Sequence, residues 1–356
     1  MSHSFYELTP EQVTAWFADR GHPPYRARQV MAGVYRRGVS DFAQMTDLPA
    51  ALRAELAREF DLRPVTPDRV VQTSDTTKLL LSLPAGGQVE CVRIAMDGAF
   101  TACVSSQIGC AVNCAFCATG HGGYERSLTP GEILAQVLAI NRLGPGVRNV
   151  VFMGMGEPFH NYANVVSAVR RMVSPDLLAL SPRRITVSTA GVVPAIHRYA
   201  EEGLATELAV SLNASTDEQR RQLMPGVARY PLAQLMEACQ HFSAAHHGRP
   251  VTFAYVLIEG VNDTFDDAER LARLLKHQPH HLNLIPLNRV THSALRAPAY
   301  PRLRAFLQAC RRHKLNVSLR HSKGEDIEAA CGQLRAERAG PAVSTNAKAA
   351  RSQRSG

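Results

Sequence analysis

The stretch Cys110-Ala111-Val112-Asn113-Cys114-Ala115-Phe116-Cys117 places three cysteines within eight residues. Three thiolates at this spacing can hold one iron–sulfur cube and leave its fourth iron without a protein ligand. That open iron can take a small molecule. A closed structural zinc site would need a fourth Cys or His nearby, and His121 is close enough in sequence to keep zinc as an alternative. The compact run of three cysteines favours the open cluster.

The length and composition of the chain fit a globular enzyme in a reducing compartment. A chain of 356 residues can form one large α/β domain with a smaller domain attached. No stretch approaches the roughly 20 apolar residues of a membrane span, and the first residues lack the pattern of a signal peptide. We therefore expect a cytoplasmic protein without a membrane segment. The eight cysteines are then metal ligands or catalytic thiols rather than a disulfide framework.

The net charge of +9 permits a polyanionic partner such as a nucleic acid. Its distribution is uneven: residues 1–95 are neutral overall, but five arginines lie within residues 19–37. Tyr25 and Tyr35 belong to the same run and could stack on bases. A solvated helix face is the commoner explanation of such a run, so the run alone leaves RNA binding open.

The pattern of apolar residues divides the chain into three regions. Residues 7–60 favour helices, with Thr9-Pro10-Glu11-Gln12 as a helix start. Residues 77–83 and 89–96 predict two strands of a hairpin. The N-terminal helical module with its hairpin would be an RNA-binding accessory to the main domain, and the last residues lack any apolar period and predict a disordered tail. The expected regions are 1–95, 96–338 and 339–356.

Most of the main domain repeats a strand followed by a helix. Apolar strands that alternate with helices indicate a parallel sheet buried on both faces. Right-handed connections then curl six such units into a partial (βα)6 barrel of the α/β class, followed by a last strand and a helix over 326–335. The expected strands are 102–105, 149–153, 184–188, 207–212, 251–258, 281–285 and 316–320.

Small and polar residues cluster where the expected strands end. The three cysteines follow the first strand, and Gly156 and Glu157 follow the second. In parallel α/β barrels the carboxyl ends of the strands carry the chemistry, so we expect these residues to face one mouth. Each polar residue taken alone is more commonly a helix cap. The later strands end at Ser188, at Ser211-Leu212-Asn213 and shortly before Asn288.

Five segments together resemble the RlmN/Cfr family of radical-SAM RNA methyltransferases, over a range from about Leu8 to Leu334. The cysteine run is shared by radical-SAM enzymes in general, whereas the segment around Cys331 is typical of this family. The matching segments are Cys103–Gln107, Cys110–Gly120, Met153–Pro158, Ser188–Pro194 and Asp326–Leu334.

The resemblance implies a set of cofactors and a reaction. Cys110, Cys114 and Cys117 would hold a [4Fe-4S] cluster whose open iron binds S-adenosyl-L-methionine (SAM), with two SAM molecules used per turnover. Cys331 would take a methyl group from the first SAM, and the radical made from the second would activate that methyl for addition to an adenine carbon. Cys103 would then release the RNA and leave a Cys103–Cys331 disulfide.

Other residues receive roles from the resemblance alone. Glu90, which lies 13 residues before Cys103, matches the glutamate proposed as the proton acceptor, although the hairpin pattern by itself places it on the surface. Glu157 would receive the SAM ammonium group, and Gly156 would allow close approach of the backbone. The other expected SAM-binding residues are Ser188, Ser211, Leu212, Asn213 and Asn288. No role is assigned to Cys91, Cys239 or Cys310.

The implied function is methylation of a ring carbon of adenosine in RNA. The first expectation is C2 of an adenosine in 23S ribosomal RNA, with transfer RNA as a further substrate; C8, the Cfr-type position, is the alternative. Asn213 stands where the family usually has His, which leaves the adenosine and its ring carbon open. Another radical-SAM activity and a non-catalytic RNA-binding or zinc protein are the competing classes. The resemblance also implies a flavodoxin or ferredoxin electron donor, and we expect a monomer.

Overall fold

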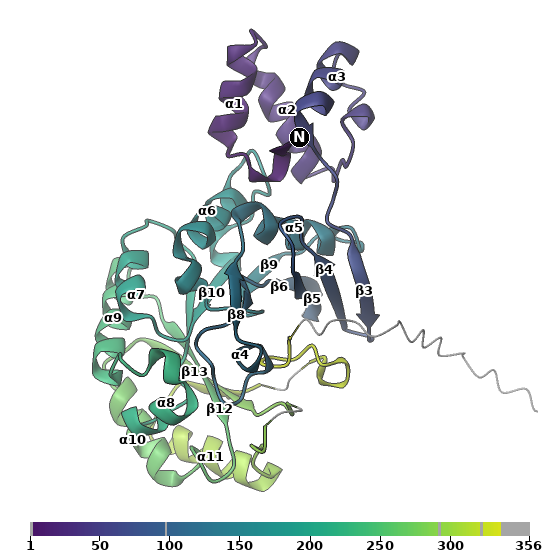
Figure 1. The fold of residues 1–356 in the computed structure, drawn as a ribbon. Helices are drawn as coiled ribbons and strands as arrows, with labels where there is room; N and C mark the ends of the chain where they lie inside the picture. Colours follow the sequence, from purple (N-terminus) through teal and green to yellow (C-terminus); the bar gives the residue numbers. More distant parts are fainter. Residues whose placement is uncertain (1–2, 97, 291–292, 321–322, 336–356) are drawn as a thin grey trace, which may run out of the picture.

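The computed structural model describes residues 3–96, 98–290, 293–320 and 323–335, so the predicted tail over 339–356 lies outside the described residues. Three helices form the N-terminal module, which projects from the barrel in Figure 1. The predicted helix start is confirmed: the Thr9 hydroxyl accepts from the Gln12 backbone, and the Gln12 side chain accepts from the Thr9 backbone. The helices are α1 (Pro10–Asp19), α2 (Pro24–Tyr35) and α3 (Ala50–Glu59), beside a short parallel pair, β1 (His3–Ser4) and β2 (Phe60–Asp61).

A ten-stranded sheet forms the barrel, with the strand order β14-β13-β12-β11-β10-β9-β6-β5-β4-β3, and a separate antiparallel pair is formed by β7 (Gln107–Gly109) and β8 (Tyr124–Ser127). Neighbours pair in parallel from β6 through β9 to β14, and antiparallel from β3 to β6. The predicted partial barrel is confirmed, with strand boundaries close to those expected. The strands are β3 (Pro67–Gln72), β4 (Thr76–Ser82), β5 (Gln88–Met96), β6 (Ala99–Cys103), β9 (Asn149–Phe152), β10 (Ile185–Thr189), β11 (Glu207–Ser211), β12 (Val251–Leu257), β13 (His280–Pro286) and β14 (Val317–Leu319).

Helices cover the outer face of the curved sheet (Figure 1). Residues alternate along each strand between this covered face and the lumen. In β9, Val150 and Phe152 are fully buried, whereas Asn149 and Val151 are half-buried and line a cavity in the lumen. The helices are α5 (Pro130–Asn141), α6 (Tyr162–Val173), α7 (Val193–Ala200), α8 (Asp217–Leu223), α9 (Leu232–Ala245), α10 (Phe265–Leu275) and α11 (Tyr300–Arg312).

The hairpin is larger and less separate than predicted. The strands β4 and β5 match the expected pair, but β3 adds a strand that was not predicted. β5 also pairs with β6, with Val92 opposite Cys103, so the three strands extend one edge of the barrel sheet. The pattern missed β3 because its residues are largely exposed and show no buried face.

The predicted helix over 326–335 is wrong. Only a 3-10 turn forms there, η6 (Glu325–Ile327), and the chain continues irregularly to Arg335. Glu328 and Gly332 have φ angles of 53° and 84°, a left-handed conformation that interrupts a helix. Figure 1 shows this C-terminal segment beside the short helix α4 (Ala118–His121), which follows the cysteine run.

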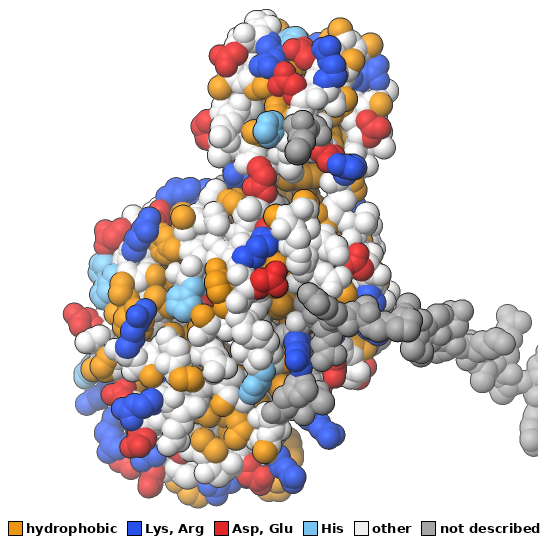
Figure 2. Space-filling model, in the orientation of Figure 1, with side chains coloured by type: hydrophobic (Ala, Val, Ile, Leu, Met, Phe, Trp, Pro, Cys, Tyr) orange, Lys and Arg blue, Asp and Glu red, His pale blue; other side chains and the backbone are white. Residues whose placement is uncertain are grey.

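Two of the five arginines in the N-terminal run form ion pairs within the module, and Arg36 donates to the Leu177 carbonyl of the barrel domain at 3.1 Å. Arg20 forms ion pairs with Glu59 at 2.6 Å and Glu55 at 3.3 Å, and Arg37 pairs with Asp47 at 3.2 Å. Figure 2 accordingly shows basic and acidic side chains intermixed over the module. The division of the chain at residue 95 stays a prediction. Among the described helices, none is long and apolar enough to cross a membrane.

Candidate active site

A cavity of about 180 Å³ opens at the carboxyl ends of the parallel strands. Nearly all the residues predicted for the cluster and for SAM line it, so strand ends far apart in sequence meet there as the barrel topology requires. Leu212 is the exception, because the strand alternation places its side chain in the core, fully buried. The predicted residues that line the cavity are Cys110, Cys114, Cys117, Gly156, Glu157, Ser188, Ser211, Asn213, Asn288 and Cys331.

The cysteine loop is held by a segment after α8. The Ala115 backbone N–H donates to the Leu223 carbonyl at 2.9 Å, and the Gly226 N–H donates to the Val112 carbonyl at 3.0 Å. A Cβ at Gly226 would lie 2.6 Å from the Cα of Val112, so the two backbones touch directly. The position of the three thiols therefore depends on this backbone contact.

The electrostatics of the thiols fit a bound cationic cluster. Burial raises the pKa of Cys110 to about 12, and burial with the neighbouring thiols raises the pKa of Cys114 well above its ordinary value. Thiolates at this depth need a cation beside them, and the iron of a cluster carries that charge.

His121 is not placed to act as the fourth ligand of a zinc ion. That side chain does not line the cavity, and its Nε2 lies 3.4 Å from the Ala115 carbonyl oxygen. Among the described residues, no three His, Cys, Asp or Glu side chains converge closely enough to hold a single metal ion. The donor set is therefore three thiols spread around one end of a cavity, which fits an open iron–sulfur cube.

Glu157 ties two strand ends together. Its carboxylate accepts hydrogen bonds from the Thr189 hydroxyl at 2.7 Å, the Ala190 N–H at 2.6 Å and the Phe159 N–H at 2.9 Å. Burial raises the pKa of this carboxyl group, and the three donors oppose that rise. Gly156 before it has a φ of 97°, and a Cβ there would lie 2.7 Å from the Gln107 nitrogen, so only glycine fits.

The loop that carries Cys331 is fixed through its carbonyl oxygens. The Asn288 amide donates to the Cys331 carbonyl at 2.9 Å, and the Ala118 N–H donates to the Gly332 carbonyl at 2.7 Å. The Thr119 hydroxyl donates to the Leu334 carbonyl at 2.5 Å. The helix after the cysteine run and the loop after β13 thus hold Cys331 at the rim of the cavity. Its side chain remains exposed.

Cys103 lies behind Cys331. The two cysteines line a second, smaller cavity of about 30 Å³, and Cys331 lines both this cavity and the larger one. Burial raises the pKa of the Cys103 thiol to about 12. All eight cysteines are free thiols in this structure. The two predicted catalytic thiols are therefore neighbours, reached from the side of the cluster cavity.

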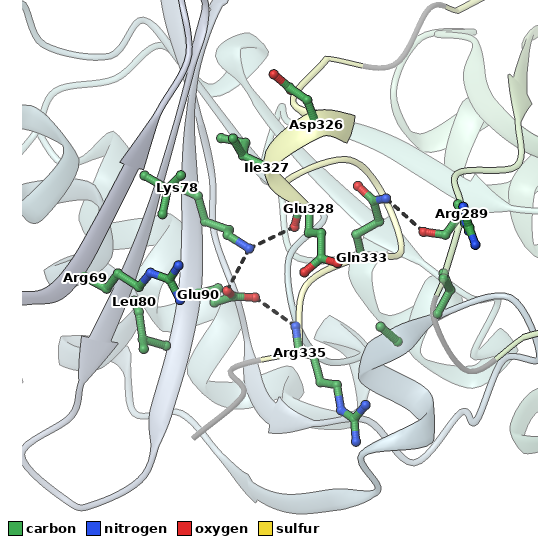
Figure 3. A pocket seen from close by; sticks show the side chains of 13 residues that line it. Arg69, Lys78, Leu80, Glu90, Arg289, Asp326, Ile327, Glu328, Gln333 and Arg335 are labelled. Atoms are coloured by element: carbon green, nitrogen blue, oxygen red, sulfur yellow. Dashed lines mark hydrogen bonds and ion pairs between the residues drawn. The ribbon is translucent and has the colours of Figure 1, made fainter. Parts of the chain in front are cut away.

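Glu90 is buried, contrary to the surface position that the hairpin pattern alone suggests. Figure 3 shows it in a third cavity, of about 360 Å³, between the β3–β5 edge and the C-terminal loop. Its carboxylate pairs with Lys78 at 3.1 Å and accepts from the Arg335 backbone N–H at 2.8 Å. Lys78 also donates to the Glu328 carbonyl at 3.1 Å. These contacts connect the predicted proton acceptor to the loop that carries Cys331.

Comparison with known proteins agrees with this geometry. Residues 4–62 match the ribosomal RNA large subunit methyltransferase N-terminal domain, and residues 104–275 match the radical SAM superfamily. The chain is 46% identical over 330 residues to the dual-specificity RNA methyltransferase RlmN of Syntrophotalea carbinolica, covering 92% of this chain and 88% of the relative. The corresponding protein of Geobacter sulfurreducens is 44% identical, with 92% and 91% covered. The chain belongs to the RlmN family.

A solved structure extends the agreement from sequence to fold. A radical SAM methyltransferase from Sphaerobacter thermophilus matches with a TM-score of 0.90 and 45% identity, covering 94% of this chain and 100% of that one. Membership in the RlmN family brings the [4Fe-4S] cluster and SAM as cofactors. The three-thiol cavity is the place in this chain that fits both.

Arg220 is a charged group of this RlmN-family site that the sequence did not reveal. It is 1% exposed and donates to the carbonyls of Ala190, Ser211 and Leu212, at the ends of β10 and β11. Burial lowers its pKa to about 10, which leaves it charged at neutral pH. Its neighbours on α8 are polar, so the sequence pattern resembles that of a surface helix.

Asn213 suits its position at the end of β11. Its φ is 53°, in the left-handed region that Asn tolerates better than most residues. The side-chain oxygen accepts from the Val256 N–H at 2.8 Å, and the amide points to the Met224 sulfur at 3.4 Å. Asn213 therefore joins the ends of β11 and β12 while lining the cavity.

Proposed function

We propose that this chain methylates C2 of an adenosine in 23S ribosomal RNA, and of an adenosine in transfer RNA, through a methyl group carried on Cys331. The observation that carries the proposal is the position of Cys331 on the rim of the cluster cavity with Cys103 directly behind it. The name "dual-specificity RNA methyltransferase RlmN" of the relatives supports RNA as the substrate, and C2 rather than C8 is the position that belongs to the RlmN type.

The cluster cysteines and Cys331 would act in different steps of the reaction. Cys110, Cys114 and Cys117 would hold the cluster, which would supply the electron for reductive cleavage of SAM. Cys331 is exposed at the rim and is placed to accept a methyl group from SAM and present it to the base. Its fixed carbonyl contacts hold the methyl carrier within reach of the cavity.

Cys103 and Glu90 would act in the release of the product. A Glu90 carboxylate in the third cavity would take the proton lost from the adenine carbon. Attack of the Cys103 thiolate on the Cys331 sulfur would then break the bond from that sulfur to the methylene carbon. The carbon would keep the electron pair and take up a proton to become the methyl group, which frees the RNA and leaves a Cys103–Cys331 disulfide for a thiol reductant to reduce. The protein would work in the cytoplasm as a monomer, with a flavodoxin or ferredoxin as electron donor and the N-terminal module as an RNA-binding accessory.

Anaerobic reconstitution tests the proposal directly. The cluster-loaded protein is given SAM, a reductant and ribosomal or transfer RNA that lacks the modification, and the product is mapped by mass spectrometry. We expect 2-methyladenosine; 8-methyladenosine would move the chain to the alternative, and a methyl on an exocyclic nitrogen or a ribose oxygen would contradict the mechanism.

Three variants separate the roles of the thiols. Cys331→Ala should abolish methylation and keep the cluster, and Cys103→Ala should accumulate a covalent RNA–protein adduct. Cys310→Ala, which removes a fully buried thiol on α11, is the matched control and should keep methylation. Methylation that survives Cys331→Ala would disprove the methyl-carrier role.

A further inference from the structure

The barrel lumen is also open at the end opposite the cluster. A cavity of about 580 Å³ lies at the amino ends of the parallel strands, where β9, β10, β13 and β14 begin. Its volume is within the range of pockets that hold a nucleotide-sized ligand. Asn149, Thr186 and Ser318 line it from three strands, so its walls are polar as well as wide.

The charged side chains that line this opening are positive. Four arginines line it with His281, and none of the described lining residues is an Asp or Glu. The structure shows no ion pair for these arginines among the described residues; the Arg184 guanidinium donates to the Asn149 side chain at 3.4 Å. In the arginine run of the N-terminal module, by contrast, Arg20 and Arg37 form ion pairs with carboxylates. The four arginines are Arg148, Arg183, Arg184 and Arg320.

The opening lies next to the catalytic cavities and shares lining residues with them. Arg320 and Met153 line the opening, the small cavity of Cys103 and Cys331, and the cluster cavity. Asn283 on β13 is shared by the opening and the cluster cavity. The opening therefore borders both the small cavity of the two catalytic thiols and the cluster cavity.

We propose that this opening is the RNA entrance, with Arg148, Arg183 and Arg184 binding backbone phosphates on either side of the target nucleotide. The inference rests on the proposed function and specifies how its substrate is bound. An enzyme that modifies a base carbon must take that base out of its stack. The flipped adenosine then extends through the lumen, past Arg320, to the methyl group on Cys331.

The geometry favours RNA over an acidic electron-transfer protein as the occupant. An electron donor has to approach the cluster, and the cluster cysteines lie at the other end of the lumen. Phosphates spaced along a strand match arginines on successive strand starts, and the concave opening beside the cavity of Cys331 suits an inserted nucleotide.

The test measures RNA binding by the full-length, cluster-loaded protein. A fluorescent 23S ribosomal RNA hairpin that contains the unmodified target adenosine is titrated at several salt concentrations against the triple variant Arg148→Ala/Arg183→Ala/Arg184→Ala. Three lost contacts should weaken binding on the order of 100-fold at 0.1 M salt and lower the slope of log K against log salt by about two. The matched control is Arg304→Ala/Arg311→Ala/Arg312→Ala, which removes three exposed arginines from α11 and should bind as the parent protein does.

Lysine replacements at the same three positions keep the charge and should restore most of the binding, which excludes misfolding as the cause. Unchanged affinity and salt slope in the triple alanine variant, with the parent protein active on the same RNA, would overturn the inference. So would a variant that binds RNA normally and loses only its reduction by flavodoxin, because the opening would then receive a protein. A parent protein that methylates no RNA would instead contradict the proposed function.

Discussion

Replacing Gly226 with alanine tests whether backbone packing places the cluster ligands. The added Cβ would lie 2.6 Å from the Val112 Cα and 2.7 Å from the Ala111 carbonyl oxygen, against an ordinary contact that begins at 3.4 Å. The cysteine loop or the segment after α8 must therefore move by about 0.8 Å. Because every close atom belongs to the backbone, no rotamer change can absorb the shift.

Overpacking of this size costs about 1–3 kcal/mol in the free energy of unfolding. A displacement near 1 Å at a reacting site lowers a rate on the order of 100-fold, so methylation should fall much further than stability. If the cysteine loop moves, Val112 is displaced away from Gly226, and we expect the thiols of Cys110 and Cys114 to move with it.

The assay compares Gly226→Ala with Gly146→Ala after anaerobic reconstitution. A Cβ at Gly146 has no atom closer than 3.7 Å, so this control adds the same methyl group without a clash. Iron and sulfide per chain, chemical denaturation and RNA methylation are measured for both variants. Full cluster content and parental methylation in Gly226→Ala would refute the reasoning that this contact positions the cysteines.

Two further predictions concern the Cys331 loop and the buried thiol behind it. Asn288→Ala removes a donor to the Cys331 carbonyl, so kcat should fall about tenfold with an unchanged KM for SAM; a raised KM at unchanged kcat would instead assign Asn288 to SAM. Iodoacetamide should label exposed Cys331 well before Cys103 at pH 7, as peptide mass spectrometry would show. Because the pKa of Cys103 is raised to about 12, its thiolate fraction and labelling rate should rise about tenfold per pH unit from 7 to 9. Equal labelling of both thiols at pH 7 would contradict the burial of Cys103.

The barrel could be predicted because its strands are defined by local sequence. Each parallel strand is a short apolar run followed by a helical period, and the topology of such repeats allows few arrangements. The edge strand β3 could not be predicted in the same way. It is held by hydrogen bonds to β4, and its exposed side chains carry no apolar signal.

The site was predictable in part. Because the carboxyl ends of parallel strands meet at one end of a barrel, the sequence alone predicts that Ser188, Ser211 and the cysteines lie close together. The roles of Arg220 and of the arginines at the opening on the amino ends of the strands could not be predicted. These roles depend on which groups surround each side chain in the fold. An arginine on a polar helix gives no sign in the sequence that its guanidinium is buried against three carbonyl groups.

The segment 326–335 is not a helix because its backbone carbonyls form hydrogen bonds with other elements of the site. In an α-helix over 326–335, the Cys331 carbonyl would accept from the N–H four residues later, and the Gly332 carbonyl would have no partner within the helix. Here these carbonyls accept from Asn288 and Ala118, which belong to two separate elements around the cluster cavity. A thiol that receives a methyl group and presents it to a base must be exposed, yet it must keep its place to within a fraction of an ångström. External bonds to the backbone meet both demands, since they fix the loop without covering the sulfur. The segment is irregular because its backbone groups serve the site rather than a helix.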